Sequence, residues 1–201
     1  MSEIAILYRT NAQSRALEQA LIRFNIPYEI FGGLKFYARK EIKDIVACLR
    51  YASNPNDIAA IERINKTFLK KDRERMIGVL PTIGKELPLV ELINFILNET
   101  NYIEFIAGRE KNMDERAENI KELIQYASGF KSTQDFLEQV TLMSAIDGRP
   151  KLQENAVKLM TIHLAKGLEF NRIFIVGVNE GLLPHARSFA KSEDLEEERR
   201  L

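Results

Sequence analysis

The sequence predicts an α/β protein in which a parallel sheet is interrupted by an α-helical insertion. Short apolar runs typical of buried strands stand near both ends of the chain, at residues 4–8, 157–160 and 173–176. Between them, residues 89–146 carry apolar side chains at helical spacing throughout. Strands at both ends of a helical middle indicate a lobe inserted into a parallel α/β layer.

Composition limits the class of protein. The chain has 201 residues and 45% hydrophobic content, enough for one core with a smaller appended lobe. Lysine plus arginine equal aspartate plus glutamate at 29 each, which argues against a strongly basic DNA-coating protein but leaves room for a local basic groove. The single cysteine, Cys48, excludes a disulfide framework and is expected in the core. Without a run of 18 apolar residues or a signal peptide, we expect a soluble cytoplasmic protein with no membrane partner.

The first strand, residues 4–8, leads into a helix whose apolar positions begin at Leu17. Arg9 lies between them. It is either a surface arginine of a strand–helix loop or an anion contact, because a guanidinium beside a helix N-terminus is well placed for phosphate. A buried strand so close to the first residue leads us to expect that a further domain precedes it.

Residues 28–30 form a second short strand, followed by two glycines and a loop in which basic and aromatic side chains alternate. Rings that stack on bases and cations that bind phosphates are typical of single-strand recognition, although ordinary loops also carry such residues. The residues concerned are Lys35, Phe36 and Arg39.

The middle of the chain is predicted to be helical, with one exception. Helices are expected over 41–53 and from Asp57, as an N-cap, to about residue 64. Residues 66–85 are rich in lysine and arginine and contain glycines and a proline, which predicts a linker or a short helix with loops. Their charges form either a solvated face or a DNA contact. A turn at 147–150 returns the chain to the sheet, and 192–201 begins a further helix.

A polar cluster connects the two C-terminal strands. It consists of Thr161, His163, Lys166, Gly167 and Glu169. Ligands of α/β sheets bind beyond the carboxyl ends of the strands, so a site is expected here. Taken alone, His163 could equally be an ordinary loop histidine, and no neighbouring His, Cys or paired Asp predicts a metal site.

Four blocks of the sequence, in order, resemble the motifs of UvrD/PcrA/Rep-type superfamily 1 DNA helicases. They are ILYRTNAQSR at 6–15, GGLKFYARKEIKD at 32–44, the segment 157–188 with TIHLAKGLEF, and EEERRL at 196–201. The resemblance implies a RecA-like, P-loop-NTPase-type sheet, the second motor domain of such a helicase. Residues 1–64 and 147–201 would form this domain, and 65–146 a reduced form of the α-helical subdomain inserted into it.

The resemblance also implies roles for single residues. Arg9 would reach the γ-phosphate of ATP as a catalytic and nucleotide-binding residue, Glu169 would hold the ribose, and Gly167 would let the backbone approach it. A second group would contact single-stranded DNA and its junctions with duplex: Lys35, Phe36, Arg39, Thr161, His163, Pro184, His185 and Arg187.

Two departures from the family pattern shape the expected activity. No GxxxxGK[ST] segment is present, so the phosphate loop and the ligands of Mg²⁺ are expected in an N-terminal motor domain of the same polypeptide. The last block stops at Leu201, before its expected arginine. We therefore expect the chain alone neither to hydrolyse ATP nor to unwind DNA.

The main hypothesis is the C-terminal motor part of an ATP-dependent 3′–5′ helicase of DNA repair or replication. Three alternatives stay open. One is a fragment of a helicase–nuclease of the RecB or AddA type. Another is a non-catalytic single-stranded-DNA-binding module, for which salt-dependent binding by the chain alone is expected. The third is a purely structural interaction domain.

Overall fold

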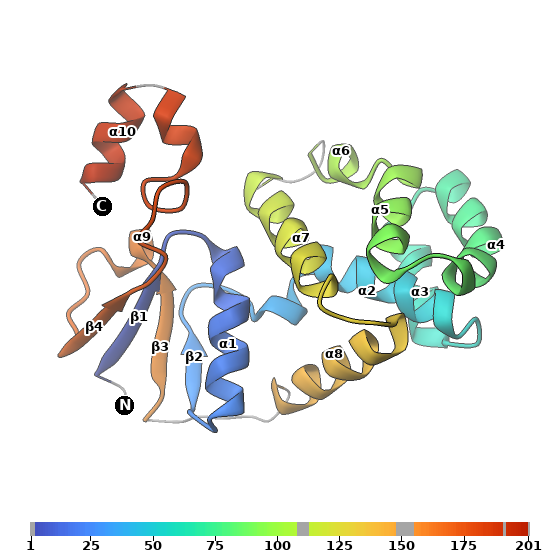
Figure 1. Ribbon diagram of the computed structural model, residues 1–201, viewed down its shortest axis with the longest axis horizontal. Helices are drawn as coiled ribbons and strands as arrows, with labels where there is room; N and C mark the ends of the chain where they lie inside the picture. The colour runs from blue at the N-terminus through green and yellow to red at the C-terminus, as the bar shows by residue number, and fades with distance from the viewer. Residues whose placement is uncertain (1–2, 108–112, 148–154, 191, 201) are drawn as a thin grey trace. The chain divides into compact units, whose positions relative to one another are not determined.

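The computed structural model describes residues 3–107, 113–147, 155–190 and 192–200. The chain forms two compact units (Figure 1). The sheet unit comprises Met1–Phe36 and Arg149–Leu201, and the helical unit comprises Tyr37–Gly148. The helical unit is thus an insertion within the sequence of the sheet unit. The predicted α/β class, with a parallel sheet and a helical insertion, is confirmed.

Within the described residues, the sheet has four strands in the order β2-β3-β1-β4, and every neighbouring pair is parallel. The predicted strands all form. β1 and β3 lie at the centre, with Tyr8 opposite Thr161. The strands are β1 (Ile4–Tyr8), β2 (Tyr28–Ile30), β3 (Val157–Thr161) and β4 (Arg172–Ile175); the helices are η1 (Asn11–Gln13), α1 (Ser14–Arg23), α9 (Ile162–Ala165), η3 (Ala186–Ala190) and α10 (Ser192–Arg199).

The central strands separate two apolar clusters, because alternate side chains of a strand point to opposite faces. One cluster contains Ala5 and Leu7 of β1 with Met160 and Ile162. The other contains Tyr8 with Leu159 of β3 and Leu21 of α1, among others. Both faces of β1 and β3 are therefore buried, as expected for parallel strands. This packing fixes the carboxyl ends of β1 and β3, where Arg9 and Thr161 lie.

The expectation that residues 173–176 form a buried strand is wrong in its burial. β4 forms, but Ile173, Phe174 and Ile175 are each about half exposed, at 50%, 55% and 52%. β4 is the outermost strand on its side, and β1 is its one strand partner in the described part of the chain. An apolar run predicts a strand, whereas its burial depends on what else packs there.

The helical unit buries many apolar side chains, including those of Ile42, Ile45 and Leu49 of α2 and of Leu92 and Ile93 of α5. Cys48 is fully buried, as predicted. Asp57 caps α3 as expected, accepting a hydrogen bond from the N–H of Ala60 at 3.0 Å. The helices are α2 (Lys40–Ser53), α3 (Ile58–Thr67), α4 (Lys70–Glu86), α5 (Leu89–Glu99), α6 (Tyr102–Ala107), α7 (Met113–Ala127) and α8 (Thr133–Asp147), with η2 (Phe36–Ala38) at the unit boundary.

The prediction of a linker or short helix over residues 66–85 is wrong. α4 is a continuous helix of 17 residues that contains Pro81. A proline cannot donate to the carbonyl four residues earlier, which here belongs to Ile77. The hydroxyl of Tyr51 on α2 donates to that carbonyl instead, at 3.2 Å. Met76 and Leu80 are buried, so packing against the core supports the helix despite its breakers.

The compact units divide the chain differently from the sequence-based proposal at the first boundary. That proposal assigned residues up to 64 to the motor domain. In the structure, α2 and α3 pack against each other and α2 also packs against α4, α5, α7 and α8, so residues from Tyr37 onward belong to the helical unit. At its other end the helical unit extends to Gly148, and the sequence-based proposal placed that boundary between 146 and 147. Among the described residues, no helix is long and apolar enough to cross a membrane.

Candidate functional site

The site is built on the carboxyl ends of β1 and β3. Arg9 follows the last residue of β1, and Thr161 is the last residue of β3, paired with Tyr8 across the sheet. The hydroxyl of Thr161 accepts a hydrogen bond from the N–H of Leu164 at 3.3 Å and so caps α9. Two segments about 150 residues apart in sequence therefore place polar groups side by side at one edge of the sheet.

The backbone at Arg9 is held by a single side chain. Oε1 of Gln13 accepts hydrogen bonds from the N–H of Arg9 at 2.9 Å and from the N–H of Thr10 at 3.0 Å. Gln13 also lies against Gly177, where an added Cβ would come within 2.1 Å of its Nε2. Gly177 has a φ of +70°, which favours glycine. The turn that aims Arg9 is thus fixed by Gln13, packed against the segment after β4.

The side chain of Arg9 is paired with a glutamate from α10. Its Nε donates to Oε1 and Oε2 of Glu198 at 2.9 and 3.1 Å, and its Nη2 donates to Oε1. The side chain of Arg9 is 21% exposed, and that of Glu198 is 6% exposed. Figure 1 shows α10 and η3 at the end of the sheet where α9 lies.

Glu198 sits in a polar socket. The hydrogen bonds from Arg9 hold the pKa of Glu198 below its ordinary value, although burial of the carboxylate raises that pKa. The N–H of His185, the charge of Arg9 and the hydroxyl of Ser188 lower it further. Glu198 is therefore ionised at neutral pH and forms a true ion pair with Arg9.

The loop after α9 exposes the remaining predicted nucleotide contacts. Gly167 has a φ of +86°, and no atom would lie within 4 Å of a Cβ added there, so the space beside its backbone is open. Glu169 and Lys166 are exposed. Among the described residues, no hydrogen bond or ion pair joins Glu169 to Arg9, so the two are presented from the same edge of the sheet without direct contact.

The predicted DNA contacts of the 32–39 loop differ in how far they are exposed. A Cβ on Gly32 would lie 2.7 Å from Leu164, so this loop packs against α9 beside the exposed His163. Lys35 is partly buried, with its Nζ 5.3 Å from the ring centre of Tyr28. The start of the loop therefore lies beside α9, whereas the ammonium of Lys35 lies over the first residue of β2.

Phe36 and Arg39 do not fit the roles expected of them. Phe36 is fully buried, so no face of its ring is available for a base. Arg39 is 6% exposed and its guanidinium donates to Oδ1 of Asn119 at 2.7 Å. Asn119 in turn donates to Glu41 at 2.6 Å. The structure therefore places Phe36 in a core and Arg39 in a buried polar network, because alternating basic and aromatic residues reveal nothing about burial.

Pro184 and His185 lie in a turn held close to the sheet edge. Leu183 packs against the apolar cluster of Ala5 and Leu7. The N–H of His185 donates to Glu198 at 3.3 Å. Both residues are partly exposed, next to the carboxylate that binds Arg9. The side chain of Arg187 lies outside the described residues.

Sequence reasoning missed Gln13, Gly177 and Glu198. Gln13 stands three residues after Thr10, the spacing of a capping box, and this spacing could have indicated its bond to the N–H of Thr10. Its second bond, to the N–H of Arg9, is known only from the structure. Gly177 is an ordinary glycine after a strand until its positive φ is known. Glu198 is one of three consecutive glutamates. Only the way α10 packs in the structure shows that Glu198 is the one that pairs with Arg9.

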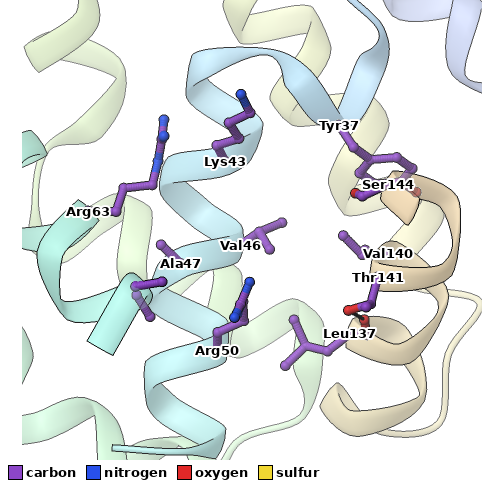
Figure 2. A pocket seen from close by; sticks show the side chains of 12 residues that line it. Tyr37, Lys43, Val46, Ala47, Arg50, Arg63, Leu137, Val140, Thr141 and Ser144 are labelled. Atoms are coloured by element: carbon purple, nitrogen blue, oxygen red, sulfur yellow. Dashed lines mark hydrogen bonds between the residues drawn. The ribbon is translucent and has the colours of Figure 1, made fainter. Parts of the chain in front are cut away.

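A separate cavity of about 510 Å³ lies in the helical unit (Figure 2). Val46 of α2 and Leu137 and Val140 of α8 face one another across it. Arg50 and Arg63 also line it, but they are paired with Asp57 and Asp44. None of the site residues predicted from the sequence lines this cavity, so the carboxyl edge of the sheet remains the candidate site.

Within the described ranges, no three His, Cys, Asp or Glu side chains group as a metal site would require.

Comparisons with known proteins identify the same family that the sequence motifs resemble. The sequence model of the UvrD-like helicase C-terminal domain matches residues 1–109 and 97–201. The chain is 36% identical to the ATP-dependent DNA helicase PcrA of Bacillus subtilis (strain 168), 33% to DNA helicase II of Haemophilus influenzae and 32% to the ATP-dependent DNA helicase UvrD1 of Mycobacterium tuberculosis (strain H37Rv). Each match covers all of this chain.

The chain spans about a third of the length of these relatives, 34%, 35% and 34% in the same order. The alignment with the Bacillus subtilis protein runs over 255 positions against 201 residues here, so this chain is shorter across the matched region. Because the family model matches both ends of the sequence and together covers the whole chain, the chain belongs to the UvrD-like helicase C-terminal domain family.

Proposed function

We propose that this chain is the second motor domain, with a reduced helical insertion, of an ATP-dependent 3′–5′ DNA helicase acting in DNA repair or replication. The observation that carries the proposal is the convergence of Arg9 and the 161–169 segment at the carboxyl ends of β1 and β3. This is where parallel α/β sheets bind ligands. The relatives are named ATP-dependent DNA helicases, which supports the same class of activity.

In this proposal Arg9 contacts the terminal phosphate of ATP. A guanidinium held at a strand end can neutralise the charge that spreads over the phosphoryl oxygens during transfer. The carboxylate of Glu169 accepts hydrogen bonds from the ribose hydroxyls, and the open space beside Gly167 lets the nucleotide approach the backbone. The phosphate loop and the Mg²⁺ ligands come from an N-terminal motor domain, and ATP lies between the two domains.

Single-stranded DNA crosses the same edge of the sheet unit. Lys35 supplies a cation, and Thr161 and His163 supply hydrogen-bonding groups from the start of α9. Pro184 and His185 continue this track, as does Arg187. We exclude Phe36 and Arg39 from it because both are buried. The chain alone presents half of the nucleotide site and half of the track, so it hydrolyses no ATP and binds DNA weakly.

The test uses the polypeptide that contains this chain together with its N-terminal motor domain. We expect an ATPase rate that rises with single-stranded DNA, and a fall in kcat of about 10²–10³-fold for Arg9→Ala, the size of effect seen when a positioned charge-stabilising group is removed. Arg23→Ala, which removes an exposed arginine at the end of α1, is the matched control. A rate indifferent to both DNA and Arg9→Ala would refute the proposal.

Two further measurements separate the alternatives. Unwinding of duplexes with a 3′ or a 5′ single-stranded tail reports polarity, and only the 3′-tailed duplex is expected to open. Fluorescence anisotropy of the isolated chain with single-stranded DNA tests the binding-module alternative. Tight, salt-sensitive binding by the chain alone would favour that alternative.

A further inference from the structure

The ion pair between Arg9 and Glu198 leaves part of the guanidinium open. Glu198 occupies the edge formed by Nε and Nη2. No described residue accepts a hydrogen bond from Nη1. A guanidinium is planar and has five donors in a fixed fork, so one carboxylate on one edge leaves the other edge available to an anion.

Further groups hold both Glu198 and Arg9 in place for this contact. The side chain of Glu198 is 6% exposed, and its Oε2 accepts a further hydrogen bond from the N–H of His185. Ser188, which is itself buried, hydrogen-bonds to the same carboxylate. The backbone of Arg9 is fixed by Gln13. With its backbone and one edge both held, the long side chain loses the rotational freedom that an exposed arginine keeps.

We infer that Glu198 is a positioning residue for the ATPase reaction: it holds the Nε–Nη2 edge of Arg9 so that the Nη1 edge meets the terminal phosphate. This inference rests on the proposed function, because it needs Arg9 to be the phosphate contact. The pairing has a cost and a benefit. The carboxylate weakens the attraction of Arg9 for an anion, but it fixes the direction in which the guanidinium points. Catalysis depends on that direction, since small misplacements of a catalytic group reduce rates strongly.

The two readouts that follow are kcat and KM for ATP. Glu198→Gln keeps the size of the side chain but replaces one accepting oxygen with an NH₂ group, which cannot accept from Arg9. We expect kcat to fall about 10- to 100-fold. We expect KM for ATP not to rise, because the lost negative charge no longer opposes phosphate binding. Glu196→Gln on the same helix is the matched control, since exposed Glu196 pairs with Arg199; its kcat should stay within about twofold.

A double-mutant cycle with Arg9→Ala shows whether Glu198 acts through Arg9. If it does, the double variant has the kcat of Arg9→Ala alone, because the group that Glu198 positions is already missing. If Glu198 merely anchors α10, the two losses multiply and the inference is overturned. Ser188→Ala gives a second check. It weakens the socket of Glu198 but keeps the contacts between Glu198 and Arg9, so we expect a smaller loss of kcat than for Glu198→Gln; a larger loss would overturn the inference.

The failure of this inference is distinguishable from failure of the proposed function. If Arg9→Ala abolishes the DNA-stimulated ATPase while Glu198→Gln leaves kcat unchanged, the proposed function stands and the positioning role is refuted. If Glu198→Gln lowers KM and raises kcat, the ion pair is a block that nucleotide must displace, and the inference is again overturned. If Arg9→Ala itself has no effect, the proposed function fails first.

Discussion

Two glycines of α4 allow a direct test of how closely α2 and α4 pack. A Cβ added to Gly84 would lie 2.7 Å from the Cβ of Ala52 and 3.2 Å from its carbonyl oxygen. Carbon atoms pack best at about 3.5–4.0 Å, so the substitution pushes two helix backbones apart by about 1 Å. Gly78, six residues earlier on the same helix, would meet nothing within 4 Å. The two positions differ in space but share one helix.

The expected changes in the free energy of unfolding have opposite signs. Overpacking a core contact costs about 1–3 kcal/mol, whereas replacing a helical glycine with alanine gains up to about 1 kcal/mol. We therefore expect Gly84→Ala to destabilise the chain by about 1–2 kcal/mol. Gly78→Ala should stabilise it by about 0.5–1 kcal/mol, because the gain in helix propensity meets no clash.

Urea denaturation followed by far-UV circular dichroism measures both values on the 201-residue chain. Ala52→Gly, combined with Gly84→Ala, removes the closest contact. The double variant should therefore show a favourable coupling energy of about 1 kcal/mol. Equal effects of Gly78→Ala and Gly84→Ala, or the absence of coupling with Ala52, would refute the reasoning that this helix crossing has no room for a methyl group.

Two further predictions concern buried charges. Asp44, which is 1% exposed, pairs with Arg63 at 2.6 Å and accepts from Tyr102 at 2.7 Å. We expect Asp44→Asn to lower the free energy of unfolding by about 2–3 kcal/mol, since Arg63 loses its counter-charge, and Tyr102→Phe to cost less; equal urea midpoints for wild type and Asp44→Asn would contradict this. Because Arg9 holds the pKa of Glu198 low, its stabilisation is complete above the ordinary glutamate pKa and is lost as pH falls through the lower folded value. The difference in urea midpoint between wild type and Glu198→Gln should be constant near neutral pH and shrink in acid; a difference that persists in acid would argue against the ion pair.

Arg9 and the 161–169 segment could be placed together from sequence, because short apolar runs predict strands and parallel strands share a carboxyl edge. The partner of Arg9 could not. Glu198 is 189 residues away and stands in a row of three glutamates. Only the docking of α10 decides which of them faces the sheet.

Burial was the second property that local patterns could not supply. Phe36 and Arg39 have the residue types of a nucleic-acid contact, yet one fills a core and the other joins a buried network with Asn119. Ile173–Ile175 have the residue types of a buried strand, yet they are half exposed because β4 is the outermost strand on its side of the sheet. Residue type sets what a side chain can do, but its neighbours set what it contacts.

The sequence alone therefore determined the strands, the helical insertion and the family motifs, and it placed Arg9 and the 161–169 segment at the carboxyl ends of strands, because periodicity and motif order are local properties of the chain. The tertiary structure decided the rest. The hydroxyl of Tyr51 bonds the carbonyl that Pro81 leaves without a donor, so α4 continues past the proline. Phe36 and Arg39 are buried, and Arg9 pairs with Glu198. Each of these depends on contacts between residues distant in sequence, which no local pattern encodes.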